Sequence, residues 1–356
     1  MNEVSKNKTC QENNKTGKIK ISNFIEEIPK SVHTPYYVFW ILICSILLTV
    51  MVNTSVSTEG LRLEFVLPSL IMAGAIWISI SIVWSSKTLI VFSTQLSEIS
   101  KSPEETYKWL CPFIEKIYSS RNLLLCGLIT CIVLELLVGL YSRWLSIPYA
   151  WYNSTFSRIY FYFLWGIASF FAGAGLEVVI GTMIIPIKLS KENLRLSLHA
   201  YRKYGIRRVG NLYLKFSVII AGAACISISG VLVSPIKSAL GVIVMYIVFS
   251  CISFLYFIAT QWSLHSALVK EKAEILDDIS EKLEQEINNL RIRENTSEDA
   301  EKRINTLLNL RKEIFSLSEW PFDASTVIRV LLSTLGPILV LLTNFWKFIS
   351  QFLGFK

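Results

Sequence analysis

Long apolar stretches almost free of ionisable side chains constrain this chain more than any other feature. Seven of them run over approximately 36–53, 65–84, 122–140, 159–186, 217–233, 239–260 and 327–346. A soluble core does not need apolar runs of about 18 residues, whereas the hydrocarbon layer of a bilayer, about 30 Å thick, does. At about 1.5 Å of rise per residue, each run can cross that layer as a helix. The sequence therefore predicts an all-α, polytopic membrane helix bundle of about seven spans.

The composition agrees with this prediction. Charged residues make up 17% of the chain and hydrophobic residues 52%, whereas soluble proteins carry about 25% charged residues. Residues 1–35 are polar and contain no apolar stretch that could serve as a cleavable signal peptide. We expect this segment to be a cytosolic tail without a fold, and the first span to direct insertion.

The distribution of basic residues predicts the orientation. Segment 187–216 contains one acid and eight basic residues, and all but Lys215 are candidates for contact with anionic lipid or with other cytosolic parts: Lys188, Lys191, Arg195, Arg202, Lys203, Arg207 and Arg208. Basic loops of this kind stay on the cytoplasmic side. The N-terminus, 85–121 and 261–326 would then be cytosolic, and the C-terminus outside, in a multi-pass protein of the cell membrane.

Residues 261–320 predict a cytosolic antiparallel helical hairpin. Apolar residues at 275, 279, 283, 287 and 290 repeat at helical spacing, a polar break follows at 293–297, and a second apolar stripe runs from Ile304 to Ile314. Two amphipathic helices with a short connection bury one stripe against the other, as in a coiled coil. The alternative is a solvated helical extension of the sixth span. Residues 321–356 would form a turn and a seventh membrane helix.

Charge leaves two roles open for the basic segment. Residues 262–326 contain fourteen acids and nine bases, against one acid and eight bases in 187–216. The acidic hairpin could dock on the basic segment because their charges are opposite. Alternatively, the basic segment faces anionic lipid, where each Lys or Arg adds about 1 kcal/mol.

Glu177 is the candidate functional residue of the fourth span. It lies in an apolar run that also contains Gly173, Gly175 and Gly181, and small residues of this kind allow close helix packing. Positions 173, 177 and 181 share one helix face. A carboxylate in lipid is costly, so Glu177 should face the bundle interior or a hydrated cavity. It could bind an ion or proton, or make a structural hydrogen bond or an ion pair with Arg329.

Glu135 is the second intramembrane acid, in the outer half of the third span. Glu177 lies in the inner half of its span, so the two carboxylates should not pair directly. They could mark two levels of one polar pathway, or each could make its own local hydrogen bond.

Catalytic motifs are not found in the sequence. The four aspartates lie outside the apolar runs, which excludes an intramembrane aspartyl protease, and the three histidines lie at or beyond their inner ends. There is no His-Glu-x-x-His, Cys-x-x-Cys or phosphate-binding Gly-Lys-Ser/Thr motif. We therefore expect no enzyme activity, metal or cofactor, and no nucleic-acid partner.

The last apolar run is preceded by Trp320-Pro321-Phe322-Asp323. Pro321 would end the preceding helix and Asp323 would cap the next. Over approximately 300–345 the chain resembles a loose group of prokaryotic multi-pass membrane proteins with a cytosolic helical segment, this turn and a last membrane helix. The resemblance implies an architecture and no particular activity.

Two hypotheses of function follow. The first is a homo-oligomeric channel or transporter-type protein in which Glu177 lines or gates a polar route and the hairpin sets assembly. The second is a membrane-anchored signalling or scaffold protein, whose hairpin and basic segment bind a partner or the lipid surface.

Overall fold

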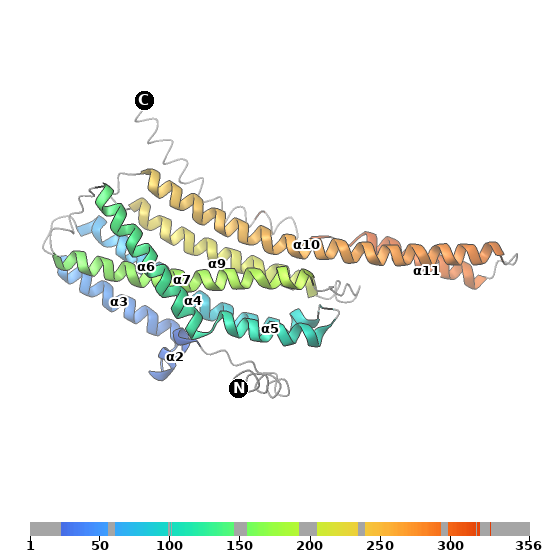
Figure 1. Ribbon diagram of the computed structural model, residues 1–356, viewed down its shortest axis with the longest axis horizontal. Helices are drawn as coiled ribbons and strands as arrows, with labels where there is room; N and C mark the ends of the chain where they lie inside the picture. The colour runs from blue at the N-terminus through green and yellow to red at the C-terminus, as the bar shows by residue number, and fades with distance from the viewer. Residues whose placement is uncertain are drawn as a thin grey trace, which may run out of the picture.

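The fold is entirely helical over the residues that the computed structural model describes: 23–55, 61–98, 100, 102–145, 155–191, 205–233, 239–292, 298–317, 319, 320 and 328. Figure 1 shows the arrangement of its elements. In chain order they are α2 (Phe24–Ser31), α3 (Tyr36–Ser55), α4 (Leu61–Glu98), α5 (Pro103–Ile117), α6 (Ser120–Leu145), α7 (Thr155–Lys191), α9 (Gly205–Val233), α10 (Ala239–Ile292) and α11 (Glu298–Phe315).

Within the described ranges, four helices contain segments long and apolar enough to cross a membrane. These segments are Ser69–Ser93 in α4, Ser120–Leu137 in α6, Tyr162–Lys191 in α7 and Cys251–Arg291 in α10, and α3 has a shorter apolar part, Tyr36–Leu47. The all-α membrane-type class is therefore confirmed. Six of the seven expected spans fall within helices α3, α4, α6, α7, α9 and α10. The seventh, 327–346, lies outside the described residues apart from Ile328.

Four long helices form a ring that we call the central ring: α4 packs on α7, α7 on α10, α10 on α9, and α9 on α4. Helix α6 lies outside the ring against α7, and only 11% of its apolar segment is buried. Its outward face is a continuous apolar stripe of Leu124, Leu125, Leu128, Ile129, Ile132, Val133, Leu136 and Leu137. A stripe of this kind suits contact with lipid rather than water.

Part of the N-terminal segment, expected to lack a fold, forms α2. The Asn23 side chain caps this helix by accepting a hydrogen bond from the Glu26 amide at 3.0 Å. Ile25 is fully buried, and the Trp40 indole donates to the Ile25 carbonyl at 3.1 Å. An eight-residue helix gains most of its stability from such docking, so its short apolar pattern gave no clear signal in the sequence.

Glu26 forms an ion pair that links α2 to α4 of the ring, and the docking of α2 therefore depends on pH. Its carboxylate lies 3.0 Å from Lys30 Nζ and 3.2 Å from Lys87 Nζ on α4. Burial raises the pKa of Glu26, but the hydrogen bonds and positive charges of Lys30 and Lys87 outweigh it, so the net pKa lies below 4.5. A lowered native pKa contributes stability above pH 4.5 that is lost as the pH falls through the native pKa. We expect the amide protection factors of α2, measured by hydrogen exchange, to fall in that acidic range.

The matched variant is Glu26→Gln, which keeps the size of the side chain and removes its charge. It should show lower α2 protection at neutral pH and little further change on acidification. If the wild type and Glu26→Gln lose protection over the same acidic range, another group controls the docking.

Helix α5 packs against both α4 and α7. The sequence did not predict this helix. It begins at Pro103, a favoured first helical residue, and carries Glu104 and Glu105 in its first turn. Leu110 and Ile114 are fully buried against the ring. Its apolar face is narrow and only fifteen residues long, which explains why it did not stand out beside the longer runs.

Helix α10 continues far beyond the ring, and α11 packs along its distal part (Figure 1). Its 54 residues correspond to a length of about 80 Å. Ile279 and Leu283 of α10 and Ile314 of α11 form a buried cluster, and Arg303 lies 3.6 Å from Glu286 across the pair. We call this pair the α10–α11 rod. In this rod α10 extends the helix of the expected sixth span, and α11 packs against the extension; the cytosolic hairpin stays a prediction.

Candidate functional site

Glu177 lies in the seam between α6 and α7. Its carboxylate Oε2 accepts a hydrogen bond from the Cys126 thiol of α6 at 3.3 Å, and the side chain is half-buried. The expected partner, Arg329, lies outside the described residues. The carboxylate therefore contacts an outer helix of the bundle.

Glu135 lies in the same seam but belongs to α6, whereas Glu177 belongs to α7. A Cβ placed on Gly166 of α7 would lie 3.2 Å from Glu135 Oε1, so the carboxylate rests on the backbone of α7. Nine residues separate Glu135 from Cys126 along α6, which corresponds to about 14 Å between the two levels. The carboxylates therefore do not pair directly. Whether they form one pathway stays a prediction.

The three α7 glycines predicted to allow close packing lie against three different neighbours. A Cβ on Gly173 would lie 2.5 Å from the Cys126 carbonyl oxygen of α6, one on Gly175 would lie 2.8 Å from Ile78 of α4, and one on Gly181 would lie 2.6 Å from Ile117 of α5. Real Cβ atoms do not come this close, so each glycine lies where its neighbour leaves no room for a larger side chain. Helix α7 is consequently the common neighbour of α4, α5 and α6.

The basic segment is described at its two ends. Lys188 and Lys191 lie in the last turn of α7, and Arg207 and Arg208 in the first turn of α9. Lys188 Nζ lies 4.1 Å from the ring centroid of Trp109 on α5, so this lysine packs on the chain itself. Arg195, Arg202 and Lys203 lie outside the described residues. Contact of the segment with lipid or with the rod stays a prediction.

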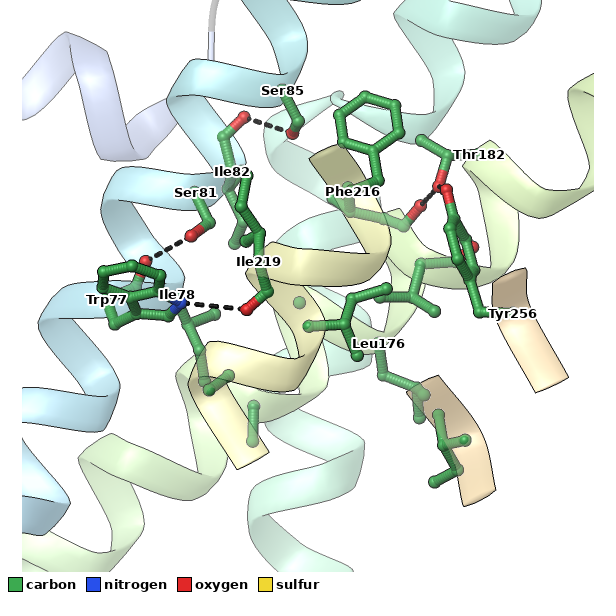
Figure 2. Close-up of a pocket in the computed structure, with 17 residues that line it drawn as sticks. Trp77, Ile78, Ser81, Ile82, Ser85, Leu176, Thr182, Phe216, Ile219 and Tyr256 are labelled. Atoms are coloured by element: carbon green, nitrogen blue, oxygen red, sulfur yellow. Dashed lines mark hydrogen bonds between the residues drawn. The ribbon is translucent and has the colours of Figure 1, made fainter. Parts of the chain in front are cut away.

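A cavity of about 180 Å³ lies in the middle of the central ring (Figure 2). Its lining residues come from all four ring helices and are mostly apolar; the polar ones include Ser81, Ser85, Thr182 and Tyr256. Of the described residues that line it, none is charged. Glu177 is not among them, although its neighbours Leu176 and Val178 are.

Three of the lining residues, Ser85, Thr182 and Tyr256, belong to a group of hydroxyl side chains. The hydroxyls of Thr182 and Tyr256 lie 3.0 Å apart, and Tyr118 donates to the Ser85 hydroxyl at 2.9 Å. Tyr213 is fully buried, its ring centroid lies 6.4 Å from that of Tyr256, and its hydroxyl has no hydrogen-bond partner among the residues that the structure describes. We call these five residues the hydroxyl cluster. Sequence reasoning missed it because only Thr182 and Tyr256 lie in apolar runs, whereas Ser85, Tyr118 and Tyr213 lie outside them and join the cluster through packing.

Trp320, the first residue of the Trp-Pro-Phe-Asp turn, is fixed to α10. Its indole stacks on His265 with ring centroids 4.0 Å apart and an interplanar angle of 6°. His265 Nδ1 lies 2.9 Å from the Glu319 carbonyl oxygen. Residues 321–323 lie outside the described residues. The contacts of Glu319 and Trp320 with His265 therefore hold the end of the segment that follows α11 against α10.

Lys272 fastens α11 to α10 at the same place, and its removal should loosen the rod. Its ammonium donates to the carbonyls of Phe315 and Leu317 and to the Glu319 carboxylate, at 3.0, 3.1 and 3.0 Å. Lys272→Met keeps the length of the side chain and removes these charge-assisted bonds, each of which contributes about 1.5–3 kcal/mol. We expect faster amide exchange over residues 310–317. Lys270→Met, on an exposed side chain two residues away, should change it little; equal effects would contradict this role.

No protein-family model, curated protein or solved structure matches this chain. The class of protein therefore follows from its helices alone. The described residues contain four helices of membrane-spanning length and polarity, with apolar side chains facing outward on α6, and these are compatible with an integral membrane protein.

Proposed function

We propose that the protein is a membrane-anchored signalling or scaffold protein whose α10–α11 rod binds a partner. The proposal rests on the continuity of α10, which passes from the cavity, at Tyr256, to the end of the rod in one helix. A helix of this length transmits a shift or rotation from one end to the other, provided that it stays unbroken. The rod would therefore report the state of the central ring.

The proposal also includes an orientation in the membrane, which rests on the distribution of basic residues. With the basic segment 187–216 inside, the N-terminus and the rod are cytosolic and the protein lies in the cell membrane. Anionic lipid at the inner surface would contact the arginines and lysines of that segment. The narrow apolar seam of the rod, with Leu307 and Leu310 half-buried, also suits assembly into a homo-oligomer through additional helices.

A photo-crosslinking residue at position 308, on the exposed side of α11, tests this proposal in the full chain in cells. We expect a crosslinked adduct of discrete mass, from a partner or a second copy. The adduct should disappear in Leu283→Asp, which disrupts the rod, and persist in Glu177→Gln. The same probe at position 132, on the apolar stripe of α6, is the control. Absence of a discrete protein adduct at 308, or one unchanged by Leu283→Asp, would contradict the proposal.

The second candidate is a channel or transporter-type protein. It is favoured by the presence of two carboxylates, Glu177 and Glu135, in one helix seam, because intramembrane acids commonly mark ion or proton paths. The uncharged lining of the cavity gives less support, since an ion in an apolar cavity loses its hydration without replacement.

Ion and proton flux into liposomes that contain the purified protein decides between the two candidates. The transport candidate predicts flux above that of empty liposomes and a decrease in Glu177→Gln. Flux equal to that of empty liposomes would exclude it for the ions tested. Flux unaffected by Glu177→Gln would remove the role of that carboxylate.

A further inference from the structure

We infer that the cavity in the central ring is a binding site for a small uncharged alcohol or phenol that enters from the bilayer. This site is independent of the proposed function, since it rests only on the cavity and the hydroxyl cluster.

The size of the cavity suits a molecule with about the bulk of a single aromatic ring. Its volume is about 180 Å³, and an apolar protein cavity of about 150 Å³ stays free of water and binds benzene. Ile78, Val179 and Ile220 are among the apolar residues of its wall. An apolar ring gains dispersion contacts against this wall.

The hydroxyl cluster favours a ligand that donates a hydrogen bond. Thr182 can donate its single hydroxyl proton to the Val178 carbonyl at 2.7 Å, and in that arrangement Tyr256 donates to Thr182 across their 3.0 Å contact. The Tyr256 oxygen then keeps a free lone pair. Figure 2 shows this pair beside the cavity. A ligand hydroxyl can donate to it, whereas a hydrocarbon or an ether cannot.

The same donor order occurs at the second pair of the cluster. Ser85 donates to the Ile82 carbonyl at 2.9 Å, and Tyr118 donates to Ser85, so the Tyr118 oxygen also keeps acceptor capacity. Tyr118 and Tyr213, whose hydroxyl has no hydrogen-bond partner among the described residues, do not line the cavity themselves. A ligand hydroxyl therefore meets the cluster at Tyr256, which does line it.

The route of entry lies on the outer surface of the ring. Trp77 of α4 and Leu176 of α7 both line the cavity, and their side chains are 39% and 44% exposed. Trp77 is held in place because its indole donates to the Ile219 carbonyl of α9 at 3.0 Å, as Figure 2 shows. Both residues belong to membrane-spanning segments, so a ligand dissolved in the bilayer can reach the cavity beside them.

Binding of phenol and of toluene to the full chain in lipid nanodiscs tests the inference, with empty nanodiscs subtracted. The two probes have nearly the same shape and differ by one hydroxyl. We expect saturable binding of both, with phenol about fivefold tighter, as one net hydrogen bond provides. Tyr256→Phe should abolish the preference for phenol. The control Tyr160→Phe should retain it, because Tyr160 donates to the Leu47 carbonyl and does not line the cavity.

Two variants fill the cavity, each from a different helix. Ala172→Leu on α7 and Ser81→Leu on α4 should each weaken the binding of both probes at least about tenfold, and Ser81→Leu serves if Ala172→Leu does not fold. Absence of saturable binding above empty nanodiscs, or binding unchanged by the filling variants, would overturn the site. A phenol preference that persists in Tyr256→Phe would overturn the assignment of Tyr256 as the acceptor.

Discussion

Replacing Gly173 with alanine should destabilise the contact between α6 and α7 by about 1–3 kcal/mol, the usual effect of overpacking a well-packed site. A Cβ at this position would lie 2.5 Å from the Cys126 carbonyl oxygen and equally close to Thr130. The backbone carbonyl cannot move away alone, so α6 has to shift as a whole. The shift would also lengthen the hydrogen bond between Cys126 and Glu177. The measurement is the apparent Tm in detergent, together with the rate at which a thiol reagent modifies Cys126.

Gly74 provides the matched control, since it also lies in a membrane-spanning helix. A Cβ there would have its nearest neighbour, Ile226, at 3.8 Å, which is ordinary van der Waals contact. Gly74→Ala should therefore leave Tm unchanged or raise it slightly, because alanine favours the helix more than glycine. Equal effects of the two substitutions, on Tm and on Cys126 reactivity, would contradict close packing at Gly173.

The membrane-type fold could be predicted because the apolar runs are long and continuous. The runs that contain Glu177 and Glu135 both became helices of the expected kind. The direction in which Glu177 points could not be predicted, because it depends on how α7 rotates against its neighbours. The hydrophobic pattern does not define that rotation in a helix that is apolar on all sides. Close packing through Gly173 orients α7 so that Glu177 meets α6.

The hydroxyl cluster illustrates a second limit of sequence reasoning. Tyr118 lies between α5 and α6, outside every apolar run, and meets Ser85 only because α5 folds back against the ring. A serine in a membrane helix can satisfy its own hydroxyl on the preceding turn, as Ser85 does, so its sequence context gives no sign of a partner. Pairs of this kind arise from long-range packing alone.

Replacing Leu283 with alanine should separate the two helices of the rod without unfolding the central ring. Leu283 is buried in a small cluster with Ile279 and Ile314, against which partly buried residues of both helices pack. Truncation of a buried leucine costs about 2–5 kcal/mol, a large part of what a two-helix contact of this size can provide. We expect amides of α11 to exchange at least about tenfold faster, since each 1.4 kcal/mol corresponds to a factor of ten. Amides of α7 should keep their protection.

Leu308→Ala is the matched control on the same rod, because Leu308 is 45% exposed and its truncation removes little buried surface. Its exchange rates should stay close to those of the wild type. The comparison also tests how far α10 depends on α11: the part of α10 beyond the ring has few buried contacts of its own, so it should fray once α11 separates. If α11 loses protection in Leu283→Ala while residues 275–290 of α10 keep theirs, α10 is a rigid lever by itself and α11 serves only as a surface for the partner. If both lose protection together, the hairpin is one cooperative unit, and a signal along α10 then requires the seam at Leu283 to remain closed.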